Sequence, residues 1–216
     1  SYLIEQCEVV VLPAAGLATQ PEPQRQPGVR ALAHSWEGRL PNTRAEAQAV
    51  QQTLGGDLFL EENASRCVLH APPVQVLHIA AHGQFRLDQP ELSYIQLADG
   101  QVYADDLFQQ DLSYELVTLS ACETGQAKAS GGDELIGLGR GFLYAGAGAL
   151  VLSLWQVADA TTRRLMEVMY RGLRKGESKP AALRAAQRSI LAEETDLHPA
   201  YWGAFEIIGS ANPLSR

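Results

Sequence analysis

Short apolar runs alternate with longer amphipathic stretches along most of the chain. Runs rich in β-branched and aliphatic residues predict buried β-strands, and they occupy residues 8–12, 29–33, 57–60, 74–81, 116–119, 149–155 and 205–208. Stretches with helical periodicity and capping residues predict helices, at residues 42–54, 63–69, 104–109, 133–145, 159–175 and 178–194. This alternation indicates an α/β fold with a mostly parallel central sheet and helices on both faces.

Turn and cap residues add local detail to this pattern. Asp99-Gly100 lies between two short apolar runs and predicts a β-hairpin. Ser178, followed by Pro180 in the first turn, predicts the start of a helix. Residues 13–41 are rich in proline and are expected to be mainly loop, and the polar segment 82–93 is expected to be irregular.

Length and composition favour one globular unit. With 216 residues, 46% of them hydrophobic, the chain can bury one substantial core, so residues 1–216 are expected to form a single domain. Ser1 is not an initiator Met, and we therefore expect the domain to be a fragment of a longer protein. No apolar run reaches the ~18–20 residues that a membrane span needs, and none is expected.

Charge and cysteine content narrow the partners and the compartment. The formal net charge of −8 argues against a nucleic-acid surface, which needs clustered Lys and Arg. Three cysteines without paired spacing favour a reducing, cytoplasmic compartment over a disulfide framework. Of these, Cys7 and Cys67 lie in apolar or helical contexts and are interpreted as packing residues.

Two predicted strands end next to residues that can perform chemistry. The strand over residues 116–119 is followed by Cys122, and the strand over residues 74–81 is followed by His82-Gly83. Open α/β sheets bind ligands at the carboxyl ends of their strands. If the two strands are neighbours, an imidazole and a thiol meet there, and His82 can act as the base that a cysteine nucleophile requires. Spacing alone leaves open whether Cys122 is catalytic, a buried structural thiol or a redox sensor.

Other candidate sites are weaker. His78 and His82 form an H-x-x-x-H pair, but four residues of strand span ~13 Å, which is too far for one metal ion. No metal site is therefore expected, and His78 is interpreted as a core histidine bonded to a neighbour. Gly137, Gly139 and Gly141 lack the Lys-Ser/Thr of a phosphate loop and are interpreted as small residues that let the helix pack tightly on the sheet, so no cofactor is expected. Ser120 and Ser153 lack the surroundings of a nucleophile elbow.

Several motifs together resemble the CHAT domain, a caspase-like family associated with tetratricopeptide repeats. The segments that carry the resemblance, in order, are His-Ile-Ala-Ala-His-Gly (78–83), Leu-Ala-Asp-Gly (97–100), Leu-Ser-Ala-Cys-Glu-Thr-Gly (119–125), Ser-Leu-Trp (153–155) and His-Pro-Ala-Tyr-Trp-Gly-Ala-Phe (198–205). The family belongs to the caspase, separase and gingipain group of cysteine peptidases. The resemblance implies a caspase-like α/β fold and a cysteine endopeptidase acting on a protein or peptide substrate.

The resemblance also implies roles for individual residues. His82 would be the general base and Cys122 the nucleophile, with the backbone N–H groups of Gly83 and Cys122 forming the oxyanion hole. Ser120, two residues before the cysteine, would line the pocket for the P1 side chain. Its neutral side chain gives no preference for Arg or Lys. Trp155 and the loop to Asp159 would form a further wall.

One departure and one alternative bear on that reading. The family often has Leu-Trp-Pro-Val-Asp-Asp where this chain has Leu-Trp-Gln-Val-Ala-Asp (154–159), which puts substrate preference in doubt. A tetratricopeptide-repeat domain or regulatory protein is the expected gating partner. The alternative is a caspase-like interaction or signalling module that keeps the fold without proteolysis. It is disfavoured because both dyad residues are present.

Overall fold

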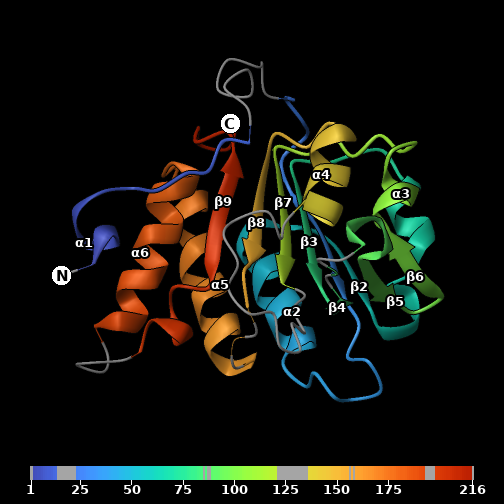
Figure 1. The fold of residues 1–216 in the computed structure, drawn as a ribbon, viewed down its shortest axis with the longest axis horizontal. Helices are drawn as coiled ribbons and strands as arrows, with labels where there is room; N and C mark the ends of the chain where they lie inside the picture. The colour runs from blue at the N-terminus through green and yellow to red at the C-terminus, as the bar shows by residue number, and fades with distance from the viewer. Residues whose placement is uncertain are drawn as a thin grey trace.

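The central element is a six-stranded sheet with the order β2-β1-β3-β7-β8-β9 (Figure 1). The computed structural model describes residues 2–13, 23–84, 86, 89–120, 136–155, 157, 159–192 and 198–215. The strands are β1 (Val29–Ala33), β2 (Gly56–Leu60), β3 (Val76–Ala80), β7 (Leu116–Ser120), β8 (Ala149–Ser153) and β9 (Phe205–Gly209). All neighbours are parallel except the β8–β9 pair, so the mostly parallel sheet predicted from the sequence is confirmed.

Helices cover both faces of this sheet, as predicted. One face packs against α2 (Thr43–Leu54), α5 (Asp159–Arg174) and α6 (Lys179–Leu191). The other packs against α3 (Ala104–Leu107), α4 (Ile136–Tyr144) and the 3₁₀-helix η3 (Arg66–His70). The two layers meet alternate residues of each strand, because successive side chains of a strand point to opposite faces. In β3, Val76 and Ala80 enter the first core, whereas Leu77 and Ile79 enter the second.

A second, three-stranded antiparallel sheet lies beside the helices of the second face. It has the order β4 (His82–Gln84), β5 (Tyr94–Leu97) and β6 (Gly100–Tyr103). The β5–β6 hairpin turns at Asp99-Gly100 as predicted, and Gly100 has φ of 138°, a value that favours glycine. The expectation that residues 82–93 are irregular is wrong in part. His82 begins β4, and Pro90–Leu92 forms the 3₁₀-helix η4.

The amino-terminal segment differs from its prediction. Residues 8–12 do not form a strand of their own, and α1 (Leu3–Gln6) precedes them. Val11 alone bridges to the outer edge of β9: its N–H donates to Ile207 O at 2.8 Å, and its O accepts from Gly209 N at 3.0 Å. Pro13 follows closely and cannot donate to a ladder, which fits the short pairing.

Apart from the helix expected over residues 63–69, the helix predictions hold within the described residues with adjusted ends; residues 133–135 and 193–194 of those predictions lie outside the described residues. Ser178 caps α6, because its Oγ accepts from Ala181 N at 3.2 Å. The helix expected over residues 63–69 is replaced by two 3₁₀ turns, η2 (Glu61–Asn63) and η3, and Asn63 ends the first instead of capping a helix. A short 3₁₀-helix, η5 (Pro199–Tyr201), precedes β9. None of the helices in the described ranges is long and apolar enough to cross a bilayer.

Glycines allow α4 to approach its neighbours closely. A Cβ at Gly137 would lie 2.1 Å from Pro90 O, and one at Gly141 would lie 3.0 Å from Ala104 O. Both are packing positions, but their partners are η4 and α3 and not the sheet that the sequence analysis expected.

A buried chain of polar side chains links β3 and β7 on the face of the sheet that α2 and α5 cover. His78 of β3 is the register partner of Thr118 of β7. The Tyr170 hydroxyl, from α5, donates to Thr118 Oγ1 at 2.8 Å and lies 3.1 Å from His78 Nδ1. The other imidazole nitrogen, Nε2, lies 3.1 Å from Glu46 Oε1 of α2, and both of these side chains are at most 1% exposed. His78 is therefore a core histidine bonded to its neighbours, as predicted.

Both sides of the His78 imidazole face polar groups. The Tyr170 hydroxyl donates to Thr118 and lies within hydrogen-bond distance of His78 Nδ1, and His78 Nε2 lies beside the Glu46 carboxyl. Burial raises the pKa of Tyr170 far above its usual value, which keeps the hydroxyl protonated. The network thus joins α2, α5, β3 and β7 through groups that have no access to water.

Tyr170→Phe should destabilise the protein by about 1–3 kcal/mol, because His78 and Thr118 each lose a buried partner while the ring volume is kept. The measurement is the free energy of unfolding in urea. Tyr201→Phe is the matched control, because Tyr201 is 47% exposed. Equal stability of the two variants would show that the network does not hold the two strands.

Candidate active site at the ends of strands β3 and β7

The strands that precede His82 and Cys122 are neighbours, as the sequence analysis required. β3 and β7 run parallel, and their last residues, Ala80 and Ser120, are register partners. The carboxyl ends of β3, β7 and β8 therefore lie along one edge of the sheet (Figure 1). His82 follows its strand end by two residues, and Cys122 follows its own by the same number. Cys122 itself lies outside the described residues.

His82 is held among aromatic rings from two other segments. It is 6% exposed. Its imidazole stacks on the indole of Trp36 with ring centroids 3.8 Å apart and an interplanar angle of 5°. The ring of Tyr94, from β5, approaches edge-on at 6.1 Å. Backbone pairing fixes the main chain as well, since β4 sets His82 opposite Gln96 of β5.

The other predicted site residues spread along the same edge. Gly83 is the second residue of β4 and is buried opposite Ile95. Ser120 ends β7 and is half-buried. Trp155 follows β8, and its indole Nε1 donates to Ala200 O at 2.9 Å. Asp159 is the first residue of α5. The structure thus brings His82, Gly83 and Ser120 to the ends of two adjacent strands, while Trp155 lies beyond β8.

Trp36 was missed by the sequence analysis. It lies in the loop between β1 and α2, within a segment predicted only as proline-rich loop. One signal was available: Trp36 comes three residues after β1, which is a neighbour of β3, the strand that precedes His82. Nothing in the local pattern indicated that its ring would stack on the imidazole.

Cys7 and Cys67 do not pack in the interior. Both thiols are free and exposed, so the interpretation of these residues as packing positions is wrong. Cys67 lies in η3 at a position that faces solvent, whereas its neighbours Val68 and Leu69 are buried. Cys7 follows the short helix α1, which has no buried residue.

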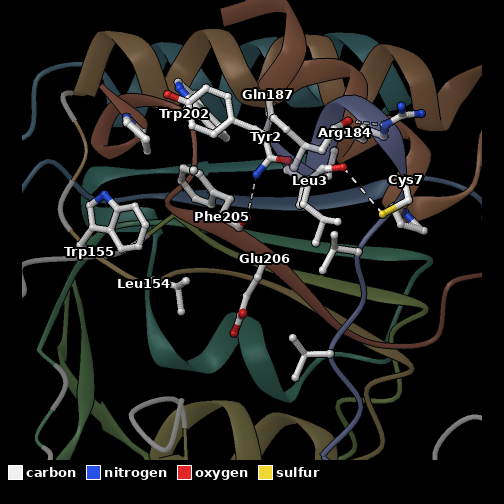
Figure 2. A pocket seen from close by; sticks show the side chains of 17 residues that line it. Tyr2, Leu3, Cys7, Leu154, Trp155, Arg184, Gln187, Trp202, Phe205 and Glu206 are labelled. Atoms are coloured by element: carbon white, nitrogen blue, oxygen red, sulfur yellow. Dashed lines mark hydrogen bonds between the residues drawn. The ribbon is translucent and has the colours of Figure 1, made fainter. Parts of the chain in front are cut away.

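The Trp155 side chain contributes to a pocket of about 350 Å³ on the outer side of β9. Figure 2 shows Trp155 at one end and Cys7 at the other, with Phe205 and Glu206 of β9 between them. The amino-terminal segment and α6 complete the lining, which is mainly apolar. Burial raises the pKa of the Glu206 carboxyl above its ordinary value.

Comparisons with known proteins agree with the motifs. The family model described as CHAT domain matches residues 1–210. Tetratricopeptide repeat protein 28 of Homo sapiens is 31% identical over 131 residues, which are 61% of this chain and 5% of that protein. The Mus musculus protein of the same name is 33% identical over 107 residues, or 50% of this chain and 4% of that protein. The matched part of the chain is thus only about one-twentieth of these relatives' length.

A solved structure shares the fold. The Arg specific cysteine proteinase gingipain R superposes with a TM-score of 0.54 at 11% identity, over 87% of this chain and 46% of that chain. A likeness at this identity concerns the fold alone. The caspase-like α/β architecture implied by the motifs is confirmed.

Glu206→Gln should stabilise the protein at neutral pH. The raised pKa means that the folded state binds the Glu206 proton more tightly than the unfolded state does, so the ionised carboxylate costs stability. This cost is complete above the folded-state pKa and disappears as the pH falls below the unfolded value of about 4.3. The stability gain of the glutamine variant, measured by urea unfolding, should therefore vanish in acid. Glu91→Gln, at an exposed position, is the control. A stability gain that is equal at neutral pH and in acid would contradict the raised pKa of Glu206.

Proposed function

The chain belongs to the CHAT domain family, and on that premise we propose that it is a cysteine endopeptidase whose dyad is His82 and Cys122. The observation that carries the proposal is the register of the two strands. Ala80 and Ser120 are direct partners at the sheet edge, and each is followed at the same offset by one member of the dyad. Two residues of chain reach at most about 7 Å, and this short offset supports the proposed meeting of the two groups at the paired edge.

The chemistry follows from those two groups. His82 takes the proton of the Cys122 thiol, and the thiolate attacks the carbonyl carbon of a peptide bond. The resulting oxyanion accepts hydrogen bonds from the backbone N–H groups of Gly83 and Cys122. The protonated His82 then gives its proton to the leaving amine, and a thioester remains on Cys122. Water, deprotonated by His82, hydrolyses the thioester and restores the thiol.

Substrate contacts are proposed for three residues at this edge. Ser120 is half-buried at the end of β7 and lines the pocket for the P1 side chain. As a small neutral residue, it supplies no charge to pair with a P1 Arg or Lys. Trp155 and Asp159, after β8, form the further wall of the substrate site.

The partners and the compartment complete the proposal. The relatives are named for tetratricopeptide repeats, and we propose that a repeat domain or a regulatory protein gates the activity. The absence of paired cysteine spacing supports a reducing, cytoplasmic location. No cofactor takes part in the proposed chemistry.

Substitution of either dyad residue tests the proposal. In a peptide-library digest, Cys122→Ala should reduce cleavage to background, because the attacking atom is removed. His82→Ala should lower kcat/KM by about 10²–10⁴-fold, the usual contribution of a general base. The digest is run with and without the proposed repeat-domain or regulatory partner. If wild type and both variants are equally inert in both settings, the chain is an interaction module.

A second readout needs no substrate. In a variant that carries Cys7→Ala and Cys67→Ala, Cys122 is the one cysteine that remains of the three in the sequence. Its alkylation by iodoacetamide can then be followed as a function of pH. An imidazole partner should extend fast alkylation below the ordinary thiol pKa of about 8.5. His82→Ala should restore the ordinary pH dependence. If the pH profile of alkylation is unchanged in His82→Ala, the imidazole and the Cys122 thiol do not interact.

A further inference from the structure

The imidazole of His82 lies flat against the indole of Trp36. Two rings 3.8 Å apart and within 5° of parallel overlap over most of their area. Tyr94 adds an edge-on contact at 73° from β5. A ring covered in this way cannot rotate about its Cβ–Cγ bond without pushing the indole aside. The plane of the imidazole is therefore set by Trp36.

The loop that carries Trp36 is itself tied to the site. It joins β1 to α2 and runs below the strand ends in Figure 1. At its start, the N–H of His34 donates to the carbonyl of Ala80, the last residue of β3, at 3.0 Å. The N–H and hydroxyl of Ser35 both donate to Glu61 Oε2, at 3.2 and 2.9 Å. The loop is thus anchored to the same strand end that presents His82.

The backbone at Trp36 is held in an uncommon conformation. Trp36 and Glu37 have φ of 49° and 58°, in the left-handed region that residues with a side chain seldom adopt. Such a conformation persists only where the surroundings impose it, and it gathers at functional sites. A turn closed by Arg39 N to Trp36 O at 3.2 Å and Leu40 N to Ser35 O at 3.0 Å keeps it in place. On the indole, the Arg39 guanidinium lies 4.5 Å from the ring centroid.

We propose that Trp36 is a positioning residue for His82: its indole holds the imidazole in the plane from which the ring exchanges protons with the Cys122 thiol. The role rests on the proposed function, because the dyad gives the ring plane its importance. Trp36 itself exchanges no proton, since the indole offers only an N–H donor at its edge. Arg39 supports the indole through a cation–π contact.

Two measurements test the proposal: one tests the contact between the Trp36 and His82 rings, and the other tests the effect of that contact on catalysis. The first is tryptophan fluorescence against pH, since a stacked imidazolium quenches an indole more than the neutral ring does. The wild-type minus Trp36→Phe difference signal should fall as His82 protonates, and His82→Asn should remove that titration. Among the described residues, Tyr94 contacts the imidazole and Arg39 contacts the indole, and both are kept in every variant so that their effect is common to all of the compared signals. A titration that persists in His82→Asn would show that the signal of Trp36 does not report on His82, and the proposal would be overturned.

The second measurement is kinetic. Trp36→Leu should lower kcat for peptide cleavage by about 10- to 100-fold with little change in KM, the scale expected when a catalytic group is displaced by about 1 Å. Trp36→Phe keeps a flat ring and should recover most of kcat. Trp202→Phe is the matched control, because Trp202 is buried but packs on Tyr2 away from His82. An undiminished kcat in Trp36→Leu would overturn the positioning role.

If the wild-type protein cleaves no peptide, alkylation of Cys122 decides instead. Loss of its low-pH reactivity in Trp36→Leu, with recovery in Trp36→Phe, would keep the positioning role although the peptidase proposal had failed. If Trp36→Leu and Trp36→Phe keep the wild-type reactivity of Cys122 while His82→Ala changes its pH profile, only the role of Trp36 is refuted. The two failures are thereby distinguishable.

Discussion

The candidate site depends on the parallel pairing of β3 with β7. Backbone hydrogen bonds fix the register of these strands, and a slip of one residue would turn every side chain of one strand to the wrong face. The register sets Ala80 against Ser120 at the edge and His78 against Thr118 within the core. The register therefore aligns both the buried polar network and the strand ends at which the candidate site lies. The hydroxyl of Tyr170 bridges the inner pair, so α5 also holds the alignment from which the site is built.

The site lies at the end of a buried interior, and His82 at that edge is itself buried and packed between aromatic rings. His82 is buried by an indole from the β1–α2 loop and by a tyrosine from the small sheet. Both contacts come from segments distant in sequence, which is how a fold gives direction to a side chain that would otherwise rotate. Fixed direction is what proton transfer requires, because a general base acts only within hydrogen-bond reach of the proton. The left-handed backbone at Trp36 is a strained conformation, and it accompanies the stacking of the indole on His82.

The features that the sequence could predict are those that depend on local composition. Apolar runs indicated β3, β7 and β8, Asp99-Gly100 indicated its hairpin, and Ser178 indicated the start of α6. The adjacency of β3 and β7 was a hypothesis that the topology confirmed. The pairing of Val11 with β9 and the strand at His82 were not predictable, because short ladders depend on a partner that a local pattern does not reveal. The stack of Trp36 on His82 depends on a backbone conformation that tertiary contacts impose. The placement of Cys122 and the roles of the site residues remain predictions.

The central claim is that an imidazole and a thiol share one cleft at the paired strand ends. The most direct measurement is the NMR titration of the His82 ring in the wild-type protein and in Cys122→Ala. If the two groups interact, they titrate as a coupled pair, and loss of the thiolate removes a charge that favours the imidazolium. The account predicts that the His82 midpoint falls to lower pH in the variant. A midpoint that is the same in both proteins would contradict it.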